Sequence, residues 1–291
     1  MKFNKEDLER WAQPLSTTEK EQCKHAINMV KDALIEYGYI VTKNLSTYES
    51  DTAYYYELRD SLNSKITIIL QGSYANNTNI RRISDVDISI LYNSRIPIAF
   101  GDYKKNIHNA LNKKFGMLDV KRKNKSINVK GNSYRKSIDV VPTFPINQIP
   151  EYGIYLITDV EKEKIYNYPL QHIKNGYIKN EATGYLYKKI VRIVKYLKYY
   201  MEINGIKSAN EIGSFNVESL IWNVPNDVIT KYSSLGFITK EIINYLRNHS
   251  LDIYTVYKEA NGIKSLCKTY EEYINYKKFV EDLFNFFEYE Y

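Results

Sequence analysis

Two aspartates stand one residue apart at the start of an apolar segment, and they restrict the fold more than any other feature of the chain. Asp85 and Asp87 flank the apolar residue Val86, and the apolar residues Ile88 and Ile90 follow at alternate positions. Because side chains alternate along a strand, the three apolar residues are predicted to face the core and both carboxylates the opposite side. Neighbouring carboxylates repel each other. The pattern therefore predicts a buried strand that presents two acidic groups to a cation.

A third aspartate occurs in a similar setting further along the chain. Asp139 interrupts the apolar stretch Ser-Ile-Asp-Val-Val, just before Pro142. Hard carboxylate oxygens suit Mg²⁺, and three carboxylates on strands can hold two metal ions roughly 3.5–4 Å apart for in-line displacement at phosphorus. We therefore predict that Asp85, Asp87 and Asp139 bind two Mg²⁺ ions, which Mn²⁺ can replace.

A Gly-Ser pair follows the strand that is predicted over residues 65–71. Gly72 lets backbone N–H groups approach a phosphate closely, and Ser73 adds a hydroxyl donor. The segment that follows could begin a short helix, whose N-terminus favours anions. A lone Gly-Ser pair or a lone Asp-x-Asp is a weak signal. The ordered set of strand, Gly-Ser turn and aspartate pair on the next strand indicates a triphosphate site beside a metal site.

The first half of the chain reads as a mixture of strands and helices. A capping box of Ser16 and Glu19 predicts the start of a long helix over residues 17–37. Apolar and β-branched patterns predict further elements: a helix at 58–62, strands at 65–70 and 85–92, a helix at 103–115, an exposed basic hairpin at 120–129, and a strand at 135–141 that Pro142 ends.

Helical periodicity dominates the second half, with helices predicted at 183–203, 214–222, 239–248 and 271–288. Pro150, Gly153 and Pro169 interrupt the pattern, so the domain boundary is predicted between about 150 and 180. We therefore predict an α/β fold of the α+β type. It divides into a domain of residues 1–160 that carries the site and a mostly helical domain of residues 161–291.

Composition bounds the function only loosely. The chain has 291 residues and a net charge of +7, which suits an anionic partner, although codon bias would also explain the abundance of Lys, Asn, Ile and Tyr. Cys23 and Cys267 are too few and too far apart for a disulfide framework or a zinc site. Because the N-terminus lacks a signal-peptide pattern and no apolar run is long enough for a membrane span, a cytoplasmic protein without a membrane partner is expected.

Gly72-Ser73, Asp85-x-Asp87 and Asp139 resemble the signature of the DNA polymerase β-type nucleotidyltransferases. The chain also resembles the bacterial cGAS/DncV-like nucleotidyltransferases (CD-NTases), most of all their CdnE clade. The segments that carry this resemblance are GSYANNTNIRRISDVDISIL, SIDVVPTFP, NYPLQHIKNGYIKNEATGYLYKKIVRIVKYLK and GSFNVESLIWNVPNDV. No zinc insertion is present. The resemblance covers roughly residues 60–230.

This resemblance implies a polymerase β-like core and a helical domain of the oligoadenylate-synthase type, with nucleotides between them. It implies an enzyme that makes cyclic oligonucleotides as antiphage (CBASS) second messengers. A cyclic dinucleotide is the product expected in the first place. ATP is the expected substrate, with UTP or GTP as candidate partners, and a downstream effector would bind the product. A monomer without an obligate nucleic-acid activator is expected. Gln71, Gly72 and Ser73 would bind the donor nucleotide, and Asp139 would serve the acceptor 3′-hydroxyl.

Four residues of the helical domain enter the predicted site or its surroundings. Lys188 and Lys195 lie on one face of the 183–203 helix and are predicted to bind the triphosphate. The alternative is a solvated basic face that also includes Arg192. Glu218 interrupts an apolar stretch and could form a buried ion pair.

Asn180 is the predicted base reader. In the family a polar residue of this region touches the base edge, and an asparagine there goes with pyrimidine use. The alternative is that Asn180 caps the following helix.

Two other functions remain open from the sequence. A nucleotidyltransferase could instead extend RNA ends, in which case its activity should fall with salt according to its phosphate contacts. A non-catalytic nucleic-acid-binding or antitoxin-like module could keep the same fold. Such a module would ordinarily lose one of the carboxylates, whereas Asp85, Asp87 and Asp139 are all present.

Overall fold

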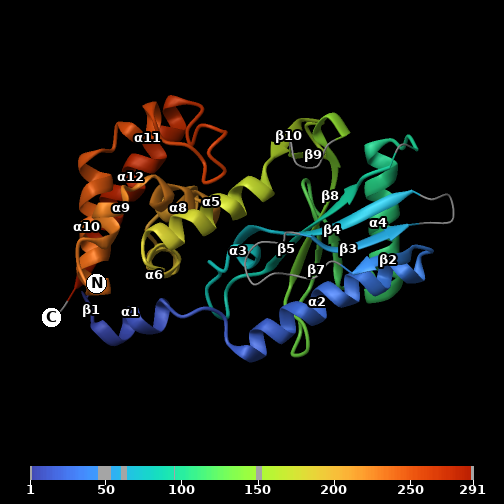
Figure 1. The fold of residues 1–291 in the computed structure, drawn as a ribbon, viewed down its shortest axis with the longest axis horizontal. Coiled ribbons are helices and arrows are strands. Elements are labelled where there is room, and N and C mark those ends of the chain that lie inside the picture. Colours follow the sequence, from blue (N-terminus) through green and yellow to red (C-terminus); the bar gives the residue numbers. More distant parts are fainter. Residues whose placement is uncertain (1, 45–53, 60–63, 95, 149–152, 290–291) are drawn as a thin grey trace. The chain divides into compact units, whose positions relative to one another are not determined.

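The computed structural model describes residues 2–289 apart from 45–53, 60–63, 95 and 149–152 (Figure 1). Contacts between residues divide the chain into two compact units, which we name by their main content. The sheet unit comprises Leu15–Asn76 and Arg81–Ile173, and the helical unit comprises Met1–Pro14, Asn77–Ile80 and Lys174–Tyr291. No helix in the described part of the chain combines the length and apolarity of a membrane span.

A mixed sheet forms the centre of the sheet unit. Its strand order is β10-β9-β8-β5-β4-β3-β2, and β6 and β7 form a hairpin in which β7 also pairs with β8. β5 and β8 run parallel, whereas the other pairs of this sheet are antiparallel. The bounds are β2 Ile40–Asn44, β3 Tyr54–Arg59, β4 Lys65–Gln71, β5 Val86–Tyr92, β6 Val120–Arg122, β7 Ile127–Val129, β8 Ile138–Pro145, β9 Ile154–Ile157 and β10 Lys164–Asn167.

Two helices cover the apolar face of this sheet, α2 (Thr17–Glu36) and α4 (Phe100–Phe115) (Figure 1). The predicted capping box of Ser16 and Glu19 is present at the start of α2. Val86, Ile88 and Ile90 are fully buried in the cluster that these helices share with the sheet. The alternation predicted for β5 is therefore confirmed, and it leaves Asp87 on the face turned away from α2 and α4.

Two predictions for the sheet unit were wrong. Residues 58–59, expected in a helix, belong to strand β3, because Leu58 pairs with Ile66 of β4; residues 60–62 of that prediction lie outside the described residues. Pro142 does not end its strand, since β8 continues to Pro145. Among the described residues, β7 pairs with β8 only as far as Val140, and β9 pairs with β8 only from Phe144. The edge of β8 that faces these two strands therefore has no described ladder pair at Pro142, where the missing N–H is tolerated.

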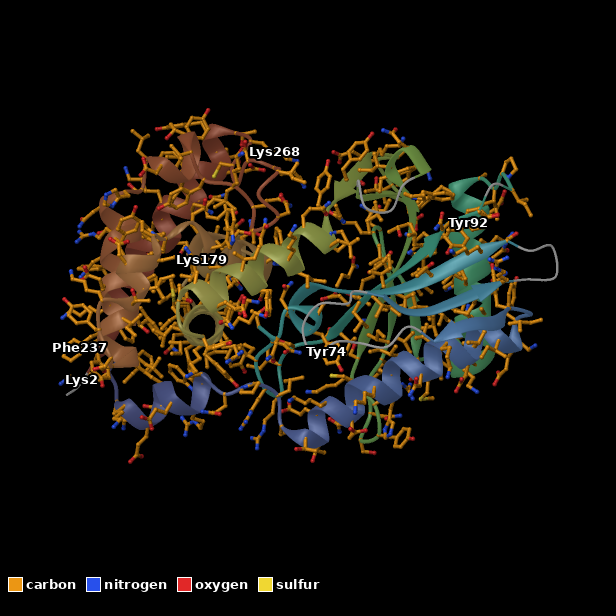
Figure 2. The ribbon with its side chains drawn as sticks, in the orientation of Figure 1. Lys2, Tyr74, Tyr92, Lys179, Phe237 and Lys268 are labelled. Carbon is orange, nitrogen blue, oxygen red and sulfur yellow. The ribbon has the colours of Figure 1, made fainter. Side chains whose placement is uncertain are left out.

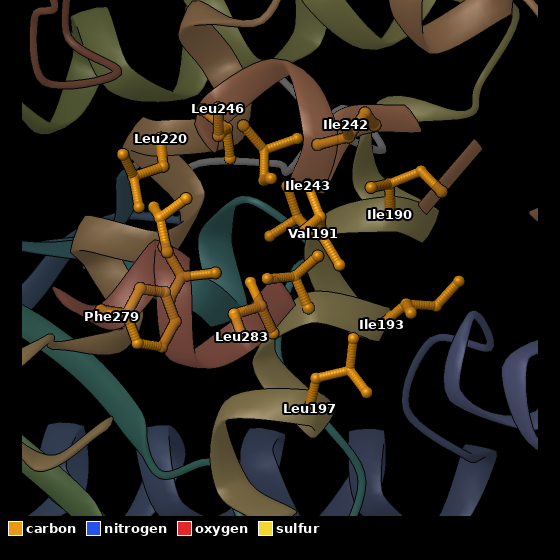
Figure 3. Packing of buried hydrophobic residues seen from close by; sticks show 14 of the residues in the cluster. Ile190, Val191, Ile193, Leu197, Leu220, Ile242, Ile243, Leu246, Phe279 and Leu283 are labelled. Carbon is orange, nitrogen blue, oxygen red and sulfur yellow. The ribbon is translucent and has the colours of Figure 1, made fainter. Parts of the chain in front are cut away.

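The helical unit packs its helices around one apolar core (Figure 3). α6, which carries the predicted basic residues, contributes Ile190, Ile193 and Leu197 to this core, and α12 contributes Phe279. Short strands β1 (Lys2–Phe3) and β11 (Glu288–Tyr289) pair in parallel. The helices are α1 Lys5–Trp11, α6 Tyr187–Ile203, α7 Ser208–Glu211, α8 Ser214–Asn223, α9 Asn226–Thr230, α10 Leu235–Asn248, α11 Asp252–Thr255 and α12 Tyr270–Phe286.

The two units change between Ile173 and Lys174, within the region of residues 150–180 predicted for the boundary and after residue 160, where the two domains were divided. Residues 161–173 stay with the sheet unit, because β10 pairs with β9 and the following helix α5 (Pro169–Ala182) begins there. Residues 1–14 join the helical unit, where Phe3, Leu8 and Trp11 enter its core. The mixed α/β class with a mostly helical second part agrees with the prediction.

Candidate active site

The Gly-Ser turn lies directly against one of the aspartates. Strand β4 ends at Gln71, which is the register partner of Asp87 on β5, and Gly72 and Ser73 begin the short helix α3 (Gly72–Ala75). Gly72 has a positive φ of 64°. A Cβ at Gly72 would lie 2.4 Å from Oδ2 of Asp87. Both the backbone conformation and this close approach require glycine. Figure 2 labels Tyr74 of this turn and Tyr92 at the other end of β5.

Gly72→Ala is expected to lower kcat by at least about tenfold, because the added methyl must displace either the turn or the Asp87 carboxylate, and small misplacements in a site are costly. Steady-state kinetics with nucleoside triphosphates measures this loss. Gly101→Ala is the matched control, since a methyl at Gly101 would meet no atom within 4 Å and the residue has no positive φ. A wild-type kcat in Gly72→Ala would show that the turn is not part of the active site.

Two side chains that sequence reasoning missed hold this region in place. Asn76 is buried, and its Nδ2 donates to the Gly72 carbonyl at 3.1 Å. Glu19, besides capping α2, accepts the Arg82 backbone N–H at 2.6 Å and pairs with Lys136 at 3.0 Å. The capping box was the only signal for Glu19 in the sequence. Its contact with Arg82 fixes the segment that precedes the aspartate pair.

The three predicted carboxylates come from two neighbouring strands. Asp87 of β5 and Asp139 of β8 are direct register partners in the parallel pair, and Asp85 immediately precedes β5. Desolvation raises the pKa of the Asp85 carboxyl, and the negative charge of Asp139 raises it further. The fold therefore brings together acidic groups that repel each other, as the alternating pattern predicted.

Asp139 is held by two donors from the β6–β7 hairpin. The Lys123 ammonium donates to its Oδ1 at 3.0 Å and to its Oδ2 at 3.3 Å, and Asn128 Nδ2 donates to Oδ1 at 2.9 Å. With the side chains so arranged, no three acidic, imidazole or thiol groups in the described ranges form a closed set of metal ligands. The chemistry of the carboxylates fits a divalent cation, and the Lys123 ammonium supplies a positive charge at Asp139.

Lys195 of α6 has partners inside the helical unit. Its ammonium pairs with Glu218 of α8 at 2.9 Å and donates to the carbonyl and hydroxyl of Thr78, and its side chain is 2% exposed. Thr78 in turn donates its hydroxyl to Glu218 at 2.6 Å. The buried ion pair predicted for Glu218 is confirmed. The alternative of a solvated basic face is wrong, because Lys188 and Arg192 are buried as well.

Arg192 binds the backbone of the same segment. Its guanidinium donates to the carbonyl of Ala12 at 2.8 Å and to that of Asn77 at 2.5 Å. Together with Lys195, Arg192 therefore fixes residues 77–78 of the stretch that joins the Gly-Ser turn to the aspartate pair along the chain. The sequence indicated on which face of the helix both cations lie, but it did not indicate which groups they bind.

Asn180 lies in α5 beside Lys179, which Figure 2 labels. The Oδ1 of Asn180 accepts the backbone N–H of Lys188 at 3.1 Å, so the side chain caps the first turn of α6 from within α5. The N-cap position itself, which the alternative interpretation gave to Asn180, is occupied by Leu186. The Lys179 ammonium donates to the Val224 carbonyl at the end of α8, and burial lowers its pKa to about 8. Both side chains thus bind the ends of neighbouring helices.

Comparison with known proteins identifies relatives of both units. Residues 56–167 match the nucleotidyltransferase domain family, and residues 174–288 match the C-terminal helical domain of cGAS/DncV-like nucleotidyltransferases. The cyclic GMP-AMP synthase CdnE03 of Staphylococcus schleiferi is 35% identical over 99% of this chain and 98% of its own length. The cyclic dipyrimidine nucleotide synthase CdnE of Cecembia lonarensis is 33% identical over 86% of this chain and 85% of its own.

A solved structure agrees with the fold. The CdnE cyclic dinucleotide synthase of Elizabethkingia meningoseptica, determined with GTP and Apcpp, superposes with a TM-score of 0.77 and 30% identity, covering 97% of this chain and 98% of that one. Nucleotidyl transfer is therefore the chemistry common to the relatives. Their products differ in base, since one is a GMP-AMP synthase and another a dipyrimidine synthase.

Proposed function

Because this chain belongs to the cGAS/DncV-like nucleotidyltransferases and is CdnE-like, we propose that it joins nucleoside triphosphates into a cyclic dinucleotide. The observation that carries the proposal is the placement of the Gly72 turn against Asp87, with Asp139 beside Asp87 on the parallel strand. This arrangement places a turn that begins a helix next to paired carboxylates, which is what transfer at phosphorus needs.

The chain's own residues divide the work as follows. Gln71, the backbone N–H of Gly72 and the Ser73 hydroxyl hold the donor triphosphate. Asp85, Asp87 and Asp139 hold two Mg²⁺ ions, or Mn²⁺ in their place. Bound there, the ions would neutralise charge on the phosphates and make the acceptor hydroxyl more acidic. Lys188 from α6 is proposed to contact the phosphates as well.

The proposed reaction consists of two successive nucleotidyl transfers. The acceptor 3′-oxygen forms a bond to the α-phosphorus of the donor, and the bond from that phosphorus to the bridging oxygen breaks, so that pyrophosphate leaves with the electron pair. The Asp139 carboxylate receives the proton of the 3′-hydroxyl. A second transfer of the same kind, between the 3′-hydroxyl and the triphosphate at the two ends of the linear product, closes the ring.

The wider setting follows from the same proposal. The enzyme acts in the cytoplasm as a monomer, takes ATP together with UTP or GTP, and needs no nucleic-acid activator. Its product would activate an effector protein in antiphage (CBASS) defence.

One experiment tests the activity. Purified protein and Mg²⁺ are incubated with each of the four nucleoside triphosphates alone, with each pair of them, and with all four together. The products are identified by mass spectrometry. A cyclic dinucleotide is expected, at a rate that depends little on salt. Extension of an added RNA, with a steep fall in rate as salt increases, would establish transfer to RNA ends instead. No product from any combination would favour the non-catalytic module.

Asn180→Asp is expected to shift base choice away from uracil by about tenfold, while stability stays close to wild type. The aspartate keeps the oxygen that caps α6 through the Lys188 N–H, but it replaces the Nδ2 donor by an acceptor. If that donor pairs with uracil O4, its loss disfavours UTP by about 1–3 kcal/mol relative to purines. Product ratios from paired nucleotides measure the shift.

Asn180→Ser is the companion variant, because it loses both the cap and the donor and is expected to lower stability by about 1 kcal/mol as well. Thermal unfolding separates the two effects. Wild-type protein that ignores UTP, or an Asn180→Asp protein with an unchanged product ratio, would leave Asn180 with the capping role alone.

A further inference from the structure

The turn between β6 and β7 carries a lysine that the proposed chemistry does not use. Lys123 opens this turn, where its backbone N–H donates to the Ser126 carbonyl at 2.8 Å. The hairpin also carries Lys121, Arg122 and Lys125, which are exposed. Lys123 differs from Lys121 and Lys125 in that its ammonium lies on a carboxylate of the candidate active site.

A buried cation fixes the backbone of this turn. Lys104 of α4 is fully buried, and its ammonium donates to the carbonyls of Lys123 at 3.0 Å and Asn124 at 2.9 Å. It also pairs with Asp159 at 2.9 Å, which forms a bidentate pair with Arg122 at 2.8 and 2.9 Å. Burying a lysine is costly unless its donors are satisfied. Here they bind the two carbonyls that start the turn, so the backbone position of Lys123 is well determined.

The side chain of Lys123 then meets Asp139 on the oxygens that a metal would use. Its ammonium contacts both carboxylate oxygens, at 3.0 and 3.3 Å, and the two side chains are 43% and 24% exposed. Asn128, the register partner of Asp139 on β7, donates to Oδ1 at 2.9 Å and turns the carboxylate toward the hairpin. A divalent cation on Asp139 would lie within a few ångströms of this ammonium, and like charges at such distances repel strongly in a partly buried site.

We propose that Lys123 is a competing counter-ion for Asp139: its ammonium neutralises the carboxylates in the absence of metal and must leave when a divalent cation binds. This inference rests on the proposed function, since it assumes that Asp139 is a metal ligand. Lys123 thereby raises the metal concentration at which the site fills. It also limits the repulsion between Asp139 and its acidic neighbours before filling.

The test compares Mn²⁺ binding to wild type, Lys123→Met, Lys123→Arg and Lys125→Met. Free Mn²⁺ is counted by its electron paramagnetic resonance signal, with and without the non-hydrolysable nucleotide Apcpp, and unfolding temperatures are measured in EDTA and in Mn²⁺. Lys123→Met is expected to lower the half-saturating Mn²⁺ concentration about threefold or more, as loss of a partly exposed ion pair and of a like charge allows. Its unfolding temperature should be lower than wild type in EDTA and should rise more with Mn²⁺.

Lys125→Met removes the same charge two residues away and is expected to bind Mn²⁺ as wild type does; Lys123→Arg keeps the charge and should do so too. Equal or weaker Mn²⁺ binding by Lys123→Met would overturn the proposal, and weaker binding only with Apcpp would make Lys123 a nucleotide contact. If wild type binds Mn²⁺ but forms no cyclic product, the proposed function fails and the comparison still decides the role of Lys123. If wild type binds no Mn²⁺ with or without Apcpp, both are overturned.

Discussion

Asp139→Asn is expected to reduce turnover by about a thousandfold or more while the protein stays folded. The amide keeps the shape of the side chain but loses the charge that holds a metal and the base that receives the 3′-hydroxyl proton, a loss of several kcal/mol of transition-state stabilisation. Stability should change by less than about 1 kcal/mol. The lost pair with Lys123 is partly exposed, and removing the charge of Asp139 relieves its repulsion of Asp85. Single-turnover rates and thermal unfolding measure the two effects.

Asp119→Asn is the matched control for this variant. Asp119 belongs to the same unit and pairs with Arg135 at 2.9 Å, so Asp119→Asn also loses one ion pair while Asp85, Asp87 and Asp139 are kept. It should keep wild-type turnover. Asp85→Asn should behave like Asp139→Asn. Near-native turnover of purified Asp139→Asn in Mg²⁺ would show that the carboxylate set is not the metal site.

Lys195→Met is expected to lower the free energy of unfolding by about 3–5 kcal/mol. It removes the ammonium that pairs with the buried Glu218 carboxylate, and removing one member of a buried pair is far more costly than removing both. Lys195→Met combined with Glu218→Leu should therefore recover most of the loss. Chemical denaturation of the two variants measures the difference. Lys189→Met, at an exposed position of the same helix, should change stability by less than about 1 kcal/mol.

The sequence also predicted that Lys195 binds triphosphate, and the same variants decide between the two roles. A phosphate contact predicts weaker nucleotide binding in both Lys195→Met and the double variant, with little loss of stability. A structural cation predicts the large stability loss and its recovery in the double variant. The contacts with Thr78 and Glu218 favour the structural role.

The local part of the site was predictable because its signals lie within a few residues. Alternation placed Asp87 opposite the buried face of β5, and a Gly-Ser pair after an apolar run placed the turn. The close approach of Gly72 to Asp87 could not be predicted, because it depends on how β4 and β5 pair. Strand β3 was missed for a related reason, since Leu58 is in a strand through its pairing with β4.

Charged side chains were the least predictable part. The sequence placed Lys123 on an exposed hairpin and Glu218 in a buried ion pair, and both statements hold as far as they go. Their partners lie 16 residues away for Lys123 and 23 for Glu218. Helical or strand periodicity says which way such a side chain points but not what another element brings to meet it. Only tertiary packing determines that Lys123 pairs with Asp139 and that Glu218 pairs with Lys195.

The chain passes between its two contact units at four points, after Pro14, Asn76, Ile80 and Ile173. A chimera that transferred only residues 174–288 of this chain into a relative would therefore carry Lys195, Glu218 and Arg192 into a foreign context. It would supply neither the Thr78 that the first two bind nor the carbonyls of Ala12 and Asn77 that Arg192 holds. Recombination within the family thus has to move three separate stretches together.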